Sequence, residues 1–378
     1  MAATEKNLDC FSGARLRIAR AFKGLTQTKL ASGVGITHQF IAGVENNHKE
    51  PSGILAQALG EVLGFETEFF YGPPLDEFKE AECNFRSWRT TPVSARTQAM
   101  AYGTLLGELL AYTSDKVTLP VENVPRINAT NPEEIERAAE RCRMQWGLGL
   151  DVPILSMVRA MESCAGVPVA EFQGIAEKVD AFSRVGNPSL VVLNNKAASR
   201  CRFDLAHECG HLVLHHSKQT GTHETEAEAN YFAAALLLPR TGFVREFPRT
   251  IHAVGDALFR LKDRWRVSIA ALIRRASDLS LIDAIQYRRL YKHLSARGWL
   301  RHEPHEFEHE KPEIVPLIFD ALREHHAMTP SELAGFLHWK PETLRTITGI
   351  ETEKQNKFAQ KVKANVLRFG PIHRSTDE

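Results

Sequence analysis

Residues with the chemistry and spacing of a metal site lie between positions 202 and 216, where the chain reads RFDLAHECGHLVLHH. His207 and His211 are four positions apart, so on an α-helix both imidazoles project from one face and can reach one ion. Glu208 follows His207 directly and could act as general base on a water that the metal activates. The leucines of the stretch supply an apolar side. The pattern predicts a buried metal-binding helix.

A third ligand is needed, because catalytic zinc is held by three protein groups and keeps a fourth position open. Glu224, Glu226 and Glu228 are all candidates, and they open an Ala/Leu-rich stretch that ends at Pro239 and favours a helix. Glu226 shares a helical face with Asn230, four positions later, whereas Glu228 points elsewhere. The choice of carboxylate therefore depends on helical phase.

The stretches RFDLAHECGH and EAEANYFAAALLLP resemble the ImmA/IrrE family of bacterial zinc metallo-endopeptidases. The resemblance implies a zincin-like domain that holds one Zn²⁺ per chain. Residue by residue, it implies His207, His211 and Glu226 as metal ligands and Glu208 as the catalytic residue. Cys209, between the two histidines, is at a variable position of the family pattern, and its helical phase turns it away from the metal.

Metal ligands usually need oriented partners, so neighbouring polar groups are candidates for positioning them. Asn230, Arg202 and Tyr231 are predicted to do so. Three histidines lie between the two predicted helices, where one could stabilise an oxyanion, but exposed loop positions are favoured for them. They are His215, His216 and His223.

The N-terminal part predicts two short helices joined by a tight turn. Thr26 is a good N-cap for a helix that begins at Gln27, and Thr37 for one that runs to Val44 or Glu45. The stretch 33–35, which reads GVG, favours a turn. This arrangement is typical of a helix-turn-helix, whose second helix enters the major groove of DNA.

The stretch GLTQTKLASGVGITHQFIAGVENNHKEPS is also similar to the Xre/Cro-like repressors. The resemblance implies a phosphate contact by Gln27 and base reading by His38 and Gln39. Gly43, at a third reading position, has no side chain. The alternative is a helical module for dimerisation or partner docking. The predicted DNA contacts are Gln27, Thr37, His38, Gln39, Asn46 and Lys49.

Length and pattern predict a mainly α protein with a small β-sheet (α+β) and several domains. We expect a helix-turn-helix domain at 12–66, a helical connector at 67–131, a zinc peptidase domain at 132–285 and a C-terminal helical docking or regulatory region at 286–378. Within the connector, the apolar helix 94–110 could form a homodimer or pack on its own chain. The charged run 302–312 reads as a solvated linker rather than a second metal site.

Composition sets limits on location and charge. The 47 basic and 46 acidic residues nearly balance, so any pull toward DNA must come from a local patch. The six cysteines are scattered without a C-x-x-C pair, which favours reduced thiols over a disulfide framework. No run approaches the roughly 20 apolar residues of a membrane span. We therefore expect a soluble cytoplasmic protein.

These observations predict a DNA-binding zinc metallo-endopeptidase. By resemblance, its substrate is a partner protein, either an Xre-type repressor or an antitoxin, in a stress or mobile-element response. The rival hypothesis is an Xre-family transcriptional regulator or toxin–antitoxin component whose zinc site is structural or sensory. The intact Glu208 argues against a purely structural site, which has no use for a general base.

Overall fold

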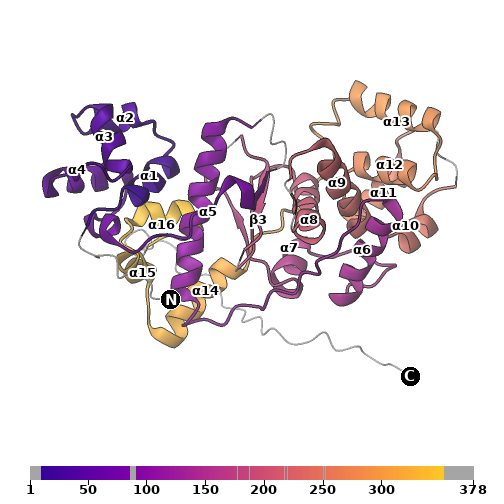
Figure 1. The fold of residues 1–378 in the computed structure, drawn as a ribbon. Helices are drawn as coiled ribbons and strands as arrows, with labels where there is room; N and C mark the ends of the chain where they lie inside the picture. Colours follow the sequence, from indigo (N-terminus) through magenta and orange to yellow (C-terminus); the bar gives the residue numbers. More distant parts are fainter. Residues whose placement is uncertain are drawn as a thin grey trace.

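The protein forms three layers, in which a small sheet separates two groups of helices (Figure 1). The structure is a computed structural model that describes residues 10–85, 91–176, 178–186, 188–216, 218, 220–249, 251 and 253–352. The strands are β1 (Cys83–Phe85), β2 (Val169–Glu171), β3 (Ala181–Arg184) and β4 (Leu190–Leu193). Their order is β1-β3-β4-β2, with β2 parallel to β4 and the other pairs antiparallel. The expected α+β class is confirmed.

Alternation along the strands assigns their side chains to two different cores. In β4, Leu190 and Val192 join the core that contains α5, whereas Val191 and Leu193 join the core that contains α8. Successive residues of a strand face opposite sides of a sheet, so a sheet buried on both faces becomes apolar throughout. The sheet therefore connects the two halves of the molecule through shared packing.

The first core combines the beginning and the end of the described chain. Glu66 donates its N–H to the carbonyl of His338 (2.9 Å), and Lys340 donates to the carbonyl of Gly64 (3.1 Å). Trp339 lies buried beside Phe65 in this core. The helices are α1 (Gly13–Phe22), α2 (Gln27–Gly33), α3 (His38–Glu45), α4 (Gly53–Leu63), α5 (Val93–Thr113), α14 (Ile314–His326), α15 (Pro330–Phe336) and α16 (Pro341–Thr348), with short 3-10 helices at Thr67–Tyr71 and Glu80–Glu82.

Helix α5, for which the sequence left open dimerisation or packing on its own chain, packs on its own chain. Its Tyr102 is fully buried. The Tyr102 hydroxyl lies within hydrogen-bond distance of two carbonyl oxygens, that of Glu171 (3.0 Å) and that of Ile347 (2.6 Å), and can donate its proton to either. The helix therefore joins the sheet to the C-terminal helices. Residues 353–378, the last part of the predicted C-terminal region, lie outside the described residues.

The second core surrounds the helix that carries the metal-site pattern. Its helices begin at strong caps: Asn131 accepts the N–H of Glu134 at the start of α6, and Thr222 forms a capping box with Thr225 at the start of α9. The helices are α6 (Pro132–Gln145), α7 (Met157–Arg159), which continues as a π-helical turn (Ala160–Cys164), α8 (Ala198–Leu214), α9 (His223–Leu237), α10 (Arg240–Glu246), α11 (Asp256–Trp265), α12 (Ile269–Asp278) and α13 (Ala284–Ala296).

Residues 303–313 cross this half of the molecule without helix or strand, and we call them the acidic strap. Glu303 and Glu306 accept hydrogen bonds from the fully buried ammonium of Lys262 (2.8 and 2.7 Å). Glu303 also accepts the backbone N–H that opens α12 (2.7 Å), and Glu306 accepts that of Ser199 in the first turn of α8 (2.9 Å). The strap thus neutralises a buried cation and caps two helices.

The far end of the acidic strap is fixed in the same way. Glu310 accepts the N–H of Val158 in α7 (2.8 Å) and pairs with the buried Arg202. Beyond it, the carboxylate of Glu162 accepts the N–H of Ile314, at the start of α14 (3.2 Å). The linker expected at 302–312 has no helix or strand and is partly exposed, but it is not solvated throughout. Its Glu303, Glu306 and Glu310 bind helix N-termini and cations that lie far away in the sequence.

Candidate metal centre

The two histidines of the H-E-x-x-H pattern meet on one face of α8. Both side chains are fully buried, and their Nε2 atoms are 3.1 Å apart with the ring planes at 80°. The four-residue spacing places them one turn apart on the helix. Gly210 allows α9 to approach this helix closely, because a Cβ there would lie 3.3 Å from the backbone of Ala229.

Glu226, in the first turn of α9, supplies a carboxylate to the same point. Its two oxygens lie 3.4 Å from Nε2 of His207 and 3.3 Å from Nε2 of His211. Among the described residues, these three form the group whose ligand atoms lie within 4.8 Å of one another.

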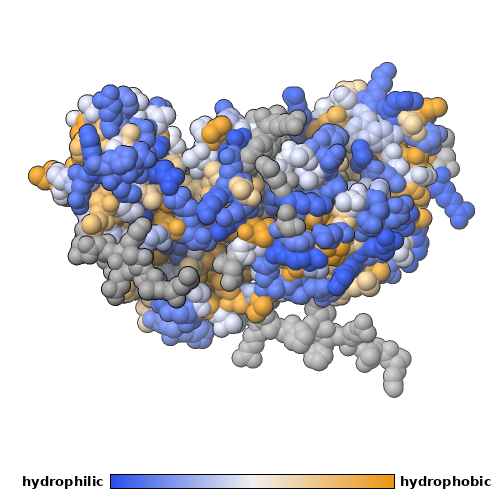
Figure 2. Space-filling model, viewed as in Figure 1, coloured by the Kyte–Doolittle hydropathy of each residue, from blue (hydrophilic) through white to orange (hydrophobic). Residues whose placement is uncertain are grey.

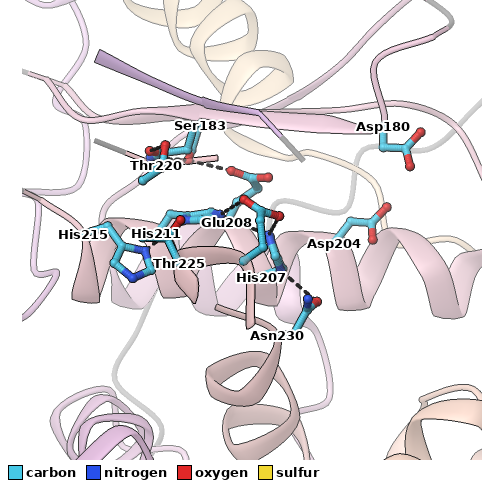
Figure 3. Close-up of polar contacts among 12 residues, drawn as sticks. Asp180, Ser183, Asp204, His207, Glu208, His211, His215, Thr220, Thr225 and Asn230 are labelled. Atoms are coloured by element: carbon cyan, nitrogen blue, oxygen red, sulfur yellow. Dashed lines mark hydrogen bonds and ion pairs between the residues drawn. The ribbon is translucent and has the colours of Figure 1, made fainter. Parts of the chain in front are cut away.

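Hydrogen bonds on the outer side of each imidazole determine which ring nitrogen carries the proton (Figure 3). Nδ1 of His207 lies 3.0 Å from Oδ1 of Asn230, which can only accept, so this nitrogen is protonated. Nδ1 of His211 lies 2.9 Å from Nδ1 of His215, whose Nε2 lies 2.8 Å from a carboxylate oxygen of Glu228. Burial and the neighbouring His211 lower the pKa of His215 to about 4, so it is neutral, donates to Glu228 and accepts from His211.

Both Nε2 atoms are consequently left with lone pairs that face each other and the carboxylate of Glu226. Two lone pairs 3.1 Å apart in a buried site repel unless a cation lies between them. Two neutral imidazoles and one carboxylate are the donor set of catalytic zinc sites. The residues present fit a zinc ion.

Glu208 is held on the sheet side of this cluster, as Figure 3 shows. Its side chain is fully buried and accepts a hydrogen bond from the hydroxyl of Ser183 in β3 (2.6 Å). The Ser183 hydroxyl in turn accepts from the amide of Asn84 in β1 (3.2 Å), and Thr220 donates to the Asn84 oxygen (2.7 Å). A strand from the connector thus contacts the candidate general base through one serine.

A cavity of about 1090 Å³ opens beside the cluster. Glu226 and Asn230 line it, together with the aromatic side chains of Tyr231, Tyr291 and Trp299. A space of this size accepts several residues of an extended peptide or a ligand of similar bulk.

Sequence reasoning singled out some of these neighbours and missed others. Asn230 contacts a histidine of the cluster, as expected of a positioning residue, whereas Arg202 bonds Glu310 and the carbonyl of Ile154. Ser183 was not identified as a site residue. His215, favoured as an exposed loop residue, is buried, and it links His211 to Glu228, which was considered only as a metal ligand. Of these, the H-E-x-x-H-x-x-x-H spacing of His215 was the one available signal, since it continues the same helical face.

The predicted DNA contacts lie on and around α3. His38 and Gln39 are exposed at its first turn, and Thr37 caps it by accepting the N–H of Phe40 (3.3 Å). Hydrophilic residues cover most of the helix-turn-helix unit on the face shown in Figure 2. These exposed side chains leave the N-terminal end of α3 accessible to a partner.

The remaining predicted contacts already have partners within the chain. Gln27 donates its amide to Glu45 (2.7 Å), and Asn46 donates to the carbonyl of Ala42 (2.8 Å). Lys49 places its ammonium over the ring of Phe40, 5.1 Å from the centroid. Exposed Asn46 and Lys49 can still turn toward a phosphate, whereas Gln27 would have to share its amide with Glu45.

Comparisons with known proteins agree with this two-part arrangement. Residues 162–277 match the model of the M78 peptidase family described as the IrrE N-terminal-like domain, and residues 16–70 match a helix-turn-helix model. A protein of Cereibacter sphaeroides described as a propionyl-CoA carboxylase regulator is 25% identical over 310 residues, which are 71% of this chain and 65% of that protein. The chain thus spans just under two thirds of that relative. No described helix is long and apolar enough to cross a membrane.

Proposed function

We propose that this chain, which joins an Xre-like helix-turn-helix to an ImmA/IrrE-like domain, is a DNA-binding regulator that acts as a zinc-dependent endopeptidase. Its substrate would be a partner protein in the cytoplasm, either an Xre-type repressor or an antitoxin. One observation carries the proposal: His207, His211 and Glu226 converge while Glu208 is held beside them by Ser183. A site that only stabilised the fold would not need this buried carboxylate.

The chemistry follows from the positions of these groups. A zinc ion bound by His207, His211 and Glu226 would supply Lewis acidity toward the scissile carbonyl and the attacking water. Glu208 would accept the proton of that water and return it to the leaving amine nitrogen. Ser183, by donating to one oxygen of Glu208, would keep the carboxylate turned toward the cluster. The adjoining cavity would hold the substrate on one side of the scissile bond.

Two measurements test this proposal. Mass spectrometry of the purified protein should find about one zinc per chain, lost in Glu226→Ala and retained in Glu208→Gln, since the second variant keeps all three ligands. Mapping of new protein N-termini in cells should find a cleaved partner with the wild type and none with Glu208→Gln. Zinc that persists in Glu226→Ala would refute the ligand set, and identical N-termini in both strains would refute the peptidase.

A second function has its own support. The relative's description names a regulator, and the helix-turn-helix shares one core with the sheet and the C-terminal helices, so a metal-induced change could reach DNA without proteolysis. In this alternative the zinc site is structural or sensory. Regulation of a target transcript that survives Glu208→Gln but is lost with Gln39→Ala would favour it. Loss with Glu208→Gln would favour the peptidase.

For DNA binding, we propose that His38 and Gln39 read bases from the major groove, with Thr37, Asn46, Lys49 and Gln27 on phosphates. A glutamine side chain can pair with an adenine edge through two hydrogen bonds. Domains of this kind commonly bind as dimers to two half-sites, so we include a homodimer on DNA in the proposal. Gln39→Ala should weaken binding to a selected operator more than to random duplex, measured by fluorescence anisotropy.

A further inference from the structure

The edge of the sheet beside Glu208 is covered by a strand of the chain's own connector. β3 pairs with β4 along one side and with β1 along the other, both antiparallel. In β1, Cys83 lies opposite Arg184 and Asn84 lies opposite Ser183, 99 positions later in the chain. Without β1, β3 would be an edge strand directly next to the candidate metal centre.

The contact reaches the candidate general base itself. Asn84 and Ser183 are buried, and the amide of Asn84 donates to the same serine hydroxyl that donates to Glu208. Thr220, from the segment between α8 and α9, donates to the Asn84 oxygen and completes the connection. An occupant of this edge is therefore in contact with the group that would handle the proton during hydrolysis.

The short length of β1 favours its exchange for another strand. The strand has three residues, and the bond that flanks it, from the N–H of Val185 to the carbonyl of Glu82, is long at 3.4 Å. Besides the buried side chains of Cys83 and Asn84, the strand is held by ion pairs of Arg184 with Glu82 and with Asp76, whose side chain is 76% exposed. Exposed ion pairs contribute about 0–1 kcal/mol. Two-stranded pairings of this length are marginal by themselves.

An edge strand binds an extended peptide by main-chain hydrogen bonds, which suits a peptidase that must accept a flexible segment. We propose that β1 occupies the substrate-binding edge of β3, and that an extended segment of the partner protein must displace it and pair antiparallel with β3. The inference rests on the proposed peptidase function for its biological meaning. Its physical content, exchange of one strand for another at β3, can be tested without catalysis.

A reversible lock of β1 provides the sharpest test. The bond between Glu82 and Val185 makes theirs a hydrogen-bonded pair, so Cys83 and Arg184 form the adjacent non-hydrogen-bonded pair. Cα atoms in such pairs are about 4.5 Å apart, within the roughly 4.4–6.8 Å that a disulfide spans. Arg184→Cys should thus form a disulfide with Cys83. Burial raises the pKa of the Cys83 thiol to about 12, so copper phenanthroline is needed as oxidant.

The probe is a fluorescein-labelled peptide with the sequence of residues 78–85 and serine in place of the cysteine, FKEAESNF. It should bind the reduced Arg184→Cys protein, bind the oxidised protein at least tenfold more weakly, and bind again after reduction. The matched control is the double variant Cys83→Ser/Arg184→Cys, in which oxidation should change nothing. Asn84→Pro, which removes a backbone N–H from β1, should bind the peptide at least tenfold more tightly than the wild type.

Equal binding to the oxidised and reduced forms, no binding to the reduced form, or no gain in Asn84→Pro would each overturn the proposal. Restoration by reduction in the same sample excludes misfolding of the variant. The two proposals can fail separately, because the peptide assay requires no cleavage and can be repeated in Glu208→Gln. If the disulfide controls peptide binding but no partner protein is cleaved, the peptidase proposal is refuted and the proposed exchange of β1 is supported. If the oxidised and reduced proteins cleave a partner equally well, the exchange of β1 is refuted and the peptidase proposal is not.

Discussion

Replacement of His215 by phenylalanine should weaken zinc binding more than replacement of Asn230 by leucine. Each side chain holds one proposed ligand by a hydrogen bond of similar length, 2.9 Å from His211 and 3.0 Å from His207. Loss of such a partner typically costs 10–100-fold in metal affinity, or about 1.4–2.8 kcal/mol. Exposure separates the two cases: His215 is 2% exposed, whereas Asn230 is exposed to solvent.

Water can replace the oxygen of Asn230, so Asn230→Leu should lose about tenfold. Water cannot enter behind His211 as easily, and His215→Phe also leaves a carboxylate oxygen of Glu228 without its donor, so it should lose about 100-fold. His215→Gln, whose amide can both accept and donate, should recover part of this loss. Competition with a chromophoric chelator at pH 7 measures the affinities, and melting curves of the zinc-free proteins verify folding. A His215→Phe protein that binds zinc as tightly as the wild type, or more tightly than Asn230→Leu, would refute the reasoning.

Three further predictions concern the supports of the site. Lys262→Met should destabilise the protein by about 3 kcal/mol and speed hydrogen exchange in the acidic strap, because it leaves the buried carboxylate of Glu303 and the partly exposed one of Glu306 without their cation; unchanged exchange would contradict this. Burial raises the pKa of Glu162 from 4.5 to about 7, so the folded state retains a proton that the unfolded chain releases. Stability should therefore fall by up to about 3 kcal/mol between pH 4.5 and 7, and melting curves should show a smaller fall in Glu162→Gln. Gly13→Ala should abolish specific DNA binding while zinc content persists, since its Cβ would lie 2.1 Å from the carbonyl oxygen of Val44; normal anisotropy titrations would rule this out.

Sequence patterns predicted those parts of the molecule whose causes are local. Caps such as Thr26 and Thr37 mark helix starts whatever surrounds them. The spacing of His207 and His211 needs no more than a helix to bring them together. Both the α+β class and the two family resemblances are confirmed.

The features that escaped prediction depend on partners far along the chain. β1 has three residues and no alternation to mark it, and it becomes a strand because β3 offers a free edge. The glutamates of the acidic strap read as a solvated run because their partners, Lys262 and the first turn of α8, are more than forty positions away for Glu306. His215 and Glu228 are separated by a loop, so no helical spacing connects them.

The shared core of the N-terminal and C-terminal helices has a consequence for protein synthesis. Residues of α14–α16 complete the packing around Phe65 and α5, yet about 200 residues separate the end of α5 from the start of α14. At the usual 5–20 residues per second, the ribosome needs about 10 to 40 seconds to make that interval. During this time the nascent helix-turn-helix exposes the apolar surface that Trp339 will later cover. A nascent chain therefore cannot present a finished DNA-binding unit before its metal-site half has been made, which couples the appearance of the two activities in time.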